Sequence, residues 1–272
     1  MLARRHFLWA PLLGLLPSRS PRPREERPAP LPPTRIVLGG DVMLSRNVGR
    51  LARAARDPAW PFRRLAHLLS RADIAFVNLE APFSDRGRPA EHGMIFRAAP
   101  EMIAGLRLAG VDVVSLANNH VRDCGDYGLE FTLGWLAGNA IAAAGAGSSE
   151  AAAHNGAVVE RNGVRFGFLA YTYDQLNGIH ADSDVRVALL DVRRMQEDVA
   201  RLRSRAGVII VSMHAGDEYR PGPNSAQVQF ARAAIDAGNW HVLRPTPAVP
   251  NPVSNSPRPI RSVGPTLFWR SP

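Results

Sequence analysis

The sequence contains no lysine and only one cysteine, Cys124. A single cysteine excludes an internal disulfide, and with it a small fold held together by disulfides. A long apolar run is missing at the N-terminus, where Phe7–Leu16 provides ten residues and a membrane-spanning helix needs about 20. What is present is an ordinary globular composition: 46% of the 272 residues are hydrophobic and 21% are charged, which excludes a wholly disordered or collagen-like chain.

Because lysine is absent, all 33 basic residues are arginines, and the net charge is +9. Most of this charge lies at the chain ends: residues 1–33 carry +4, residues 239–272 carry four arginines and no acid, and residues 34–238 carry only +1. Prolines are divided in the same way, with eight in each end segment and seven between them. A nucleic-acid groove needs arginines clustered with aromatic platforms, whereas here acids are interleaved with them. We therefore expect no nucleic-acid partner.

The N-terminus predicts export. Arg4 and Arg5 precede the apolar run, and the string RRHFL resembles a twin-arginine export signal. An ordinary secretory signal or an N-terminal anchor is the alternative, because no A-x-A cleavage site follows. We expect an exported protein, periplasmic or at the cell surface, with the twin-arginine pathway as one route. Contact with a membrane is expected only through the N-terminal signal or anchor.

Composition and pattern divide the chain into four segments. They are an export signal (1–18), a proline- and arginine-rich spacer (19–33), a folded domain (34–238) and a second proline- and arginine-rich segment (239–272). In the folded domain, apolar runs typical of buried strands alternate with helical periodicity. Strands are expected at Arg35–Leu38, Ile74–Leu79, Val111–Leu116, Val164–Tyr171 and Val208–Met213. Helices are expected at Arg46–Arg56, Pro61–Arg71, Pro100–Ala109, Tyr127–Asn139, Val192–Arg203 and Ala226–Ala237. This alternation predicts an α/β fold with a covered sheet.

Polar side chains that can bind a metal or transfer a proton follow four of the predicted strands. They are Asp41, Asn78 with Glu80, Asn119 with His120, and His214. Ligands bind beyond the carboxyl ends of strands in open α/β sheets, so residues far apart in the chain can converge there. Carboxylate oxygen, amide oxygen and imidazole nitrogen together suit manganese, zinc or iron. The pattern therefore indicates a divalent metal site.

Each of these residues also has a purely structural interpretation. Asp41 could be the N-cap of the helix that follows, a common role for aspartate. Asn118, Asn119 and His120 could form a loop in which asparagine accepts unusual dihedral angles. His214 could be a buried, hydrogen-bonded imidazole. None of these interpretations explains why such residues follow four of the predicted strands.

Five strings in the chain are ordered and spaced as in one known family. They are GGDVML (39–44), FVNLEAPF (76–83), VVSLANNHVRDCGDYGL (113–129), GFLAYT (167–172) and VSMHAGDEYRPGPNSAQVQFARAAIDAG (211–238). With them the chain resembles the CapA family of capsule-synthesis proteins, named for bacterial poly-γ-glutamate capsules and similar to calcineurin-like metallophosphoesterases. The resemblance spans about residues 34–268. It implies a metallophosphoesterase-like sandwich of two β-sheets flanked by helices, with a two-metal centre at the strand ends.

The resemblance also implies roles for individual residues. Asp41 matches a metal-binding aspartate, Asn119 a metal-binding asparagine and His214 a metal-binding histidine. Glu80 occupies the place of a second, bridging carboxylate, and Asn78 is its rival because it faces the same side of the strand. His120 matches a histidine expected to be catalytic by stabilising or protonating a leaving oxygen.

Two departures from the family pattern put the metal centre in doubt. The family's GHHPH motif, which supplies further histidine ligands, aligns with Arg244–Ala248 (RPTPA), and no histidine follows His241. Residues 239–272 therefore resemble a degenerate C-terminal part of the same domain, although a shifted reading frame would also produce such a segment. The second departure is Ala215, where the family usually has tryptophan. We expect weak metal binding, with as few as one position occupied, unless His241 or a residue from outside completes the site.

Two functions follow from the resemblance. The first is an exported CapA-like protein that assists synthesis, anchoring or processing of a capsular polymer such as poly-γ-glutamate. The second is a metal-dependent phosphoester hydrolase, weakened or inactive because the GHHPH-type histidines are absent. The expected partner is accordingly an anionic polymer or a phosphoester substrate. A non-catalytic remnant of either is the third interpretation.

Overall fold

The computed structural model describes residues 33–86, 95–173, 186–216, 222–238, 241–243 and 266–269. These residues belong to one compact unit that begins at Leu31. The predicted export signal and nearly all of the predicted spacer lie outside the described residues. Within the described part, no helix combines the length and hydropathy of a membrane span.

The first sheet has five strands in the order β4-β3-β2-β1-β9. Their bounds are β1 Thr34–Val42, β2 Ile74–Leu79, β3 Val113–Ser115, β4 Ala142–Ala144 and β9 Thr266–Trp269. The first four strands run parallel, and β9 pairs antiparallel with β1. All six residues of β2 are buried, as expected for a central parallel strand that is covered on both faces.

The second sheet has four strands in the order β5-β6-β7-β8. Their bounds are β5 Ala157–Arg161, β6 Val164–Thr172, β7 Val208–His214 and β8 His241–Leu243. A two-residue turn, Asn162-Gly163, joins β5 to β6 as an antiparallel hairpin, and both of its residues have positive φ. This is the dipeptide that such tight hairpin turns favour. The strands β6, β7 and β8 are parallel.

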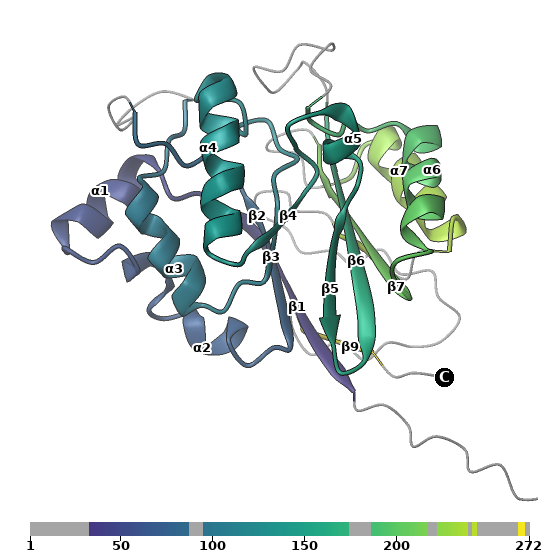
Figure 1. Cartoon of the computed structure of the whole chain (residues 1–272), viewed down its shortest axis with the longest axis horizontal. Coiled ribbons are helices and arrows are strands. Elements are labelled where there is room, and N and C mark those ends of the chain that lie inside the picture. Colours follow the sequence, from purple (N-terminus) through teal and green to yellow (C-terminus); the bar gives the residue numbers. More distant parts are fainter. Residues whose placement is uncertain are drawn as a thin grey trace, which may run out of the picture. The chain divides into compact units, whose positions relative to one another are not determined.

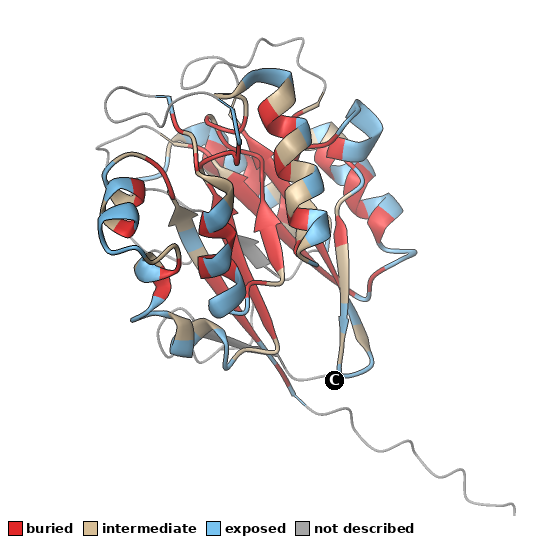
Figure 2. Cartoon of the chain, turned by 60° about the vertical axis from the view of Figure 1, so that its left-hand side comes forward, coloured by how far each residue is buried: buried red, intermediate tan, exposed pale blue. Residues whose placement is uncertain are grey.

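Helices cover the outer face of each sheet, so the unit has four layers (Figure 1). The helical segments are α1 Arg46–Ala54, η1 Trp60–Phe62, α2 Ala66–Leu69, η2 Pro100–Met102, α3 Ile103–Leu108, α4 Gly125–Gly138, α5 Glu150–Ala153, α6 Val192–Leu202 and α7 Ser225–Asp236. One apolar core lies between the first sheet and α1, α3 and α4, and another lies between the second sheet and α6 and α7. Figure 2 shows the result: the central strands β2, β6 and β7 are almost wholly buried, and the helices expose their outward sides.

A third apolar core joins the two sheets face to face. It contains Ile36 and Phe76 from the first sheet and Phe168 and Ile210 from the second. The rings of Phe76 and Phe168 are stacked with centroids 5.6 Å apart and planes 7° from parallel. The α/β fold predicted from the strand and helix pattern is confirmed, and so is the sandwich of two sheets flanked by helices that the family resemblance implied.

A bulge in β1 decides which way Asp41 points. Leu38 pairs with Phe76 and Asp41 pairs with Asn78, so three steps along β1 match two steps along β2. The extra residue is absorbed at Gly39-Gly40, where the sequence favoured the end of the strand. Without this bulge Gly40 would stand opposite Asn78, and the alternation of a strand would turn Asp41 toward the helices.

The prediction of one helix over Pro61–Arg71 is wrong. The structure divides this segment into η1 and α2, with three-residue turns between them. Phe62 is buried against α3, where a Cβ on Gly105 would lie 2.5 Å from the Phe62 ring. The packing of Phe62 against α3 therefore outweighs the helical periodicity of residues 61–71.

The C-terminal segment 239–272 is described only at β8 and β9. Residues 244–248, which align with the family's GHHPH motif, lie outside the described residues, as do the prolines at 245, 247 and 250. His241 is described by its backbone alone: its Cα pairs with that of Ile210, four residues before His214 on the neighbouring strand.

Candidate functional site

The carboxyl ends of β1, β2, β3 and β7 meet at one edge of the sandwich. Asp41 is the last residue but one of β1, Glu80 directly follows β2, and His214 is the last residue of β7. Ligand atoms of these three residues all lie within 4.8 Å of one another, and each residue is half-buried. His214 belongs to the second sheet and lies far from the two acids in the chain, so the docking of the two sheets brings the three side chains together.

The His214 imidazole lies at the centre of this group. Its Nδ1 is 3.4 Å from Asp41 Oδ1, and its Nε2 is 3.6 Å from Glu80 Oε1. Asn119, in the loop after β3, places its Oδ1 3.0 Å from the same Nε2. All four residues predicted as metal ligands are therefore neighbours in space.

Asn78 supports the site from behind the ligands. Its Nδ2 donates to Asp41 Oδ1 at 2.7 Å and lies 3.1 Å from His214 Nδ1. Its Oδ1 accepts a hydrogen bond from Asn118 Nδ2 at 3.1 Å, and Asn118 also donates to the Leu79 carbonyl at 2.9 Å. The Asn78 oxygen faces Asn118 and is therefore turned away from the ligands, whereas its Nδ2 holds Asp41 in place. Glu80, directly after β2, is the residue that forms a triad with Asp41 and His214.

The structural interpretation of Asp41 as a helix cap is wrong. The N-cap of α1 is Ser45, four residues further along. His214 has polar partners, as its structural interpretation expected. Its half-buried position between two carboxylates also suits a metal ligand. Asn118 is the loop residue with the structural role, since it is fully buried and its Oδ1 accepts from the His120 N–H at 3.1 Å.

His120, which follows Asn119 in the chain, belongs to a separate buried pair. Its Nδ1 is 2.8 Å from Asp123 Oδ2, and the side chains of the two residues are 7% and 1% exposed. Asp123 Oδ2 also accepts the N–H of Phe96, whose ring is stacked on the imidazole with centroids 3.7 Å apart. The carboxylate thus fixes the ring and leaves Nε2 as the nitrogen that can contact a ligand. Sequence reasoning missed Asp123, although its spacing of three residues from His120 was the available signal.

The lone cysteine, Cys124, follows Asp123 in surroundings that favour its protonated thiol. Burial, followed by the charge of Asp123, raises the pKa of the Cys124 thiol to about 11. A thiol with so high a pKa is protonated at neutral pH, and the thiolate is the reactive form.

The donor set fits one divalent ion. Two carboxylates, one imidazole and one amide oxygen, from Asp41, Glu80, His214 and Asn119, are the mixture that manganese, zinc or iron accepts. A zinc-like site takes about four ligands, so these four donors would satisfy a single ion. A second ion would need donors beyond those assembled among the described residues.

Comparison with known proteins shows which family the chain resembles. The profile of the bacterial capsule synthesis protein PGA_cap matches residues 35–258. Capsule biosynthesis protein CapA of Bacillus anthracis is 29% identical over 213 residues, which cover 75% of this chain and 51% of that protein. PGA biosynthesis protein CapA of Bacillus subtilis (strain 168) is 27% identical over 217 residues, covering 76% of this chain and 57% of that protein.

Among solved structures, a crystal structure of a hypothetical protein from Thermus thermophilus resembles 77% of this chain and 66% of its own, with 19% identity and a TM-score of 0.45. The chain spans little more than half the length of the two CapA relatives. The family profile, in contrast, covers most of the chain and all of the site residues described above. The chain therefore belongs to the bacterial capsule synthesis protein family PGA_cap.

Proposed function

We propose that this protein is an exported accessory protein for synthesis, anchoring or processing of an anionic capsular polymer such as poly-γ-glutamate. The observation that carries the proposal is the family match over residues 35–258, within which Asp41, Glu80 and His214 converge. Two carboxylates that approach a single imidazole in this way are stabilised by a bound cation, so their placement favours a role in binding.

The proposed centre binds a divalent ion through Asp41, Glu80, His214 and Asn119. When bound, the ion would supply positive charge that polarises a carbonyl or phosphoryl group of the polymer or its precursor. The protein's own residues keep the ligands oriented. Asn78 holds the Asp41 carboxylate, and contacts of this kind behind the ligands typically account for about 10- to 100-fold in metal affinity.

In this proposal His120 acts on the bound polymer rather than on the ion. Asp123 fixes the imidazole through Nδ1, and Phe96 covers one face of the ring. Nε2 is then directed at a bound group by rigid neighbours, which is how a side chain is positioned to donate a hydrogen bond to an oxygen that gains charge. The export signal predicted for residues 1–18 would bring this site to the periplasm or the cell surface.

A phosphoester hydrolase is the second candidate. The pair of His120 and Asp123 beside a carboxylate-rich centre favours it, because a histidine oriented by a carboxylate is typical of hydrolytic sites. The donors assembled among the described residues suffice for one ion, and this argues for an activity well below that of a two-ion enzyme.

The experiment that tests the proposal is complementation. The full chain is expressed in a capsule-forming bacterium whose own CapA-type protein is deleted, and cell-bound poly-γ-glutamate is measured. The wild-type protein should restore polymer, Asp41→Ala and His214→Ala should not, and His67→Ala, which removes an exposed histidine in α2, should behave like wild type. Failure to restore polymer, together with hydrolysis of a chromogenic phosphodiester that is lost in His120→Ala, would replace the proposal with the hydrolase.

A further inference from the structure

Three side chains from distant segments form a stack that includes His120, the residue after Asn119 in the chain. The imidazole of His120 is stacked on the ring of Phe96, with planes 20° from parallel. The guanidinium carbon of Arg46 lies over the same phenylalanine ring, 5.6 Å from its centroid. This distance is within the range of about 6 Å in which a cation is attracted to an aromatic face. Arg46 and His120 therefore both contact the Phe96 ring.

The stack is fixed by hydrogen bonds from both sides. Ser45, directly before Arg46, accepts the N–H of Arg97 at its Oγ with a distance of 2.9 Å. Asp123 accepts the N–H of Phe96 and also holds His120. The segment that carries Phe96 is thus fastened to the start of α1 on one side and to the His120 loop on the other. These hydrogen bonds fix the positions of the segments that carry the three side chains.

Arg46 has two features that its structural surroundings do not require. Its φ is 50°, in the left-handed region that residues other than glycine seldom adopt and that costs them about 1 kcal/mol or more. It is half-buried, yet none of the acids among the described residues pairs with its guanidinium. Arg63, in contrast, pairs with Asp57, and Arg161 pairs with Asp112. Strained backbone is concentrated at binding and active sites.

We propose that Arg46 is the binding residue for an oxyanion of the substrate, a carboxylate of γ-linked glutamate or a phosphoryl group, held next to the metal centre. Phe96 is the positioning residue, because its ring packs against one face of the guanidinium. The N–H groups at the edge of the guanidinium can then donate hydrogen bonds to two oxygens at once. This inference rests on the proposed function, since it names the charged group of the polymer that the site recognises. A positive charge at Arg46, five residues after Asp41 in the chain, would also favour the approach of an anionic polymer to a site that contains two carboxylates.

The test is direct binding to the full-length protein saturated with manganese, measured by calorimetry. The probes are a γ-linked glutamate oligomer, the same oligomer with its α-carboxyls amidated, and inorganic phosphate. Arg46→Gln should weaken binding of a charged probe by about tenfold or more, the usual loss for a hydrogen bond to a charged group. Arg50→Gln is the matched control, since Arg50 lies one turn further along α1 and its guanidinium is bound to Asn47. It should bind like wild type.

A second variant protects the test against misfolding. Arg46→Gly removes the side chain and accepts a φ of 50° without strain, so it should unfold no earlier than wild type and should bind as weakly as Arg46→Gln. The amidated oligomer should bind wild type and both variants equally. Loss confined to the glutamate oligomer identifies a carboxylate, and loss confined to phosphate identifies a phosphoryl group.

Three results would overturn the inference. They are equal affinity of Arg46→Gln and wild type for both charged probes, an equal loss in Arg50→Gln, or no binding of either probe to wild type. The first two leave the complementation result unaffected, so they refute the role of Arg46 without refuting the polymer function. Failed complementation with intact, Arg46-dependent binding of phosphate would refute only the polymer function.

Discussion

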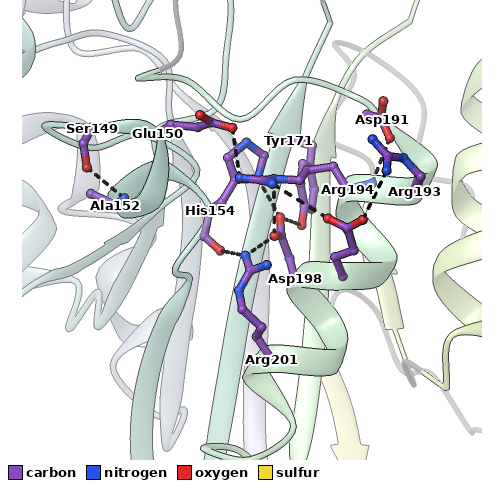
Figure 3. A network of polar contacts seen from close by, with 11 residues as sticks. Ser149, Glu150, Ala152, His154, Tyr171, Asp191, Arg193, Arg194, Asp198 and Arg201 are labelled. Atoms are coloured by element: carbon purple, nitrogen blue, oxygen red, sulfur yellow. Dashed lines mark hydrogen bonds and ion pairs between the residues drawn. The ribbon is translucent and has the colours of Figure 1, made fainter.

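His154 Nδ1 lies 2.6 Å from Asp198 Oδ2 in a buried pair that joins the end of α5 to α6. The same carboxylate oxygen accepts a hydrogen bond from Tyr171 Oη of β6 at 2.8 Å. The other oxygen pairs with Arg201, and Arg194 Nε lies 3.9 Å from it (Figure 3). A carboxylate with 0% exposure is thereby surrounded by donors on both oxygens, as a buried charge requires.

Replacing Asp198 with alanine should strongly destabilise the fold. The change removes the common partner of His154, Tyr171 and Arg201, and breaking a buried pair in this way typically costs about 3–5 kcal/mol. Urea denaturation measures the free energy of unfolding. The matched control is Glu197→Ala, one residue earlier in α6 at a largely exposed site, with an expected change within about 0.5 kcal/mol. Equal midpoints for the two variants would contradict the prediction.

Tyr171 should make the protein sensitive to alkaline pH. Burial, and then the charge of Asp198, raise the pKa of its hydroxyl well above the usual value. The unfolded chain loses this proton near pH 10 while the folded protein retains it, so the stabilisation is complete below about pH 10 and declines as pH rises further. For one group the decline is at most about 1.4 kcal/mol per pH unit.

The measurement is the free energy of unfolding between about pH 9 and about pH 11.5, a range that brackets the titration of an unfolded tyrosine near pH 10. Tyr171→Phe should be less stable than wild type at the lower end of this range and should lose less stability as pH rises. Tyr173→Phe, two residues further along the chain, is the control and should keep the wild-type slope. Identical slopes for all three proteins would refute the prediction.

The metal centre should bind manganese or zinc weakly and at about one ion per chain. Calorimetry on metal-free protein gives the stoichiometry, and Asp41→Ala should lower the affinity by more than about tenfold, because losing a ligand exceeds the effect of losing a residue behind it. Asp57→Ala, which removes an acid that pairs with Arg63 at the surface, serves as control. Tight binding of two ions by wild type would contradict the single-ion site.

Restoring the family's histidines should raise metal occupancy. The combined change Arg244→Gly, Pro245→His, Thr246→His and Ala248→His writes GHHPH into residues 244–248. The preceding strand supports the choice of position, because Leu243 of β8 pairs with Ser212, two residues before His214. The metal content of the purified protein is measured by elemental analysis. A control with alanine in place of each new histidine should stay at the wild-type level, and an unchanged metal content in the histidine variant would show that the register is wrong.

Asp123→Ala should loosen the His120 loop. The carboxylate holds His120 Nδ1 and the N–H of Phe96, and leaving such buried donors without a partner costs about 1–3 kcal/mol each. Thermal unfolding should occur at a lower temperature than in Asp126→Ala, which removes an acid whose side chain is 65% exposed. If both variants melt together, Asp123 does not fix the loop.

The strand pattern made much of this fold predictable. The run IAFVNL predicted β2 at its observed bounds. The rule that ligands gather at the carboxyl ends of strands selected a larger group that also held Asn78 and His120, and the family resemblance reduced it to the four ligands Asp41, Glu80, Asn119 and His214. Apolar runs and strand ends are local features, so the sequence alone reveals them. The Asn162-Gly163 turn was also a local signal, although β5 was not predicted from it.

What could not be predicted depends on contacts between distant segments. The choice between Asn78 and Glu80 depends on Asn118, which turns the Asn78 oxygen away from the triad. The direction of Asp41 depends on how β1 and β2 come into register across the glycines. The break near Phe62 depends on the close approach of α3. In each case the deciding partner is more than 30 residues away in the chain, beyond the reach of periodicity or propensity.

The stacked pair Phe76 and Phe168 has a consequence for how variants of this protein should be interpreted. Asp41, Glu80 and Asn119 are carried by the first sheet and His214 by the second, so the separation of the ligands is set by how closely the two sheets dock. Phe76 is two residues from Asn78 on β2 and its ring is one half of that contact. Replacing Phe76 or Phe168 with a smaller residue would therefore change the distances between the ligands. Such a core substitution would be observed first as a lower affinity for the metal ion.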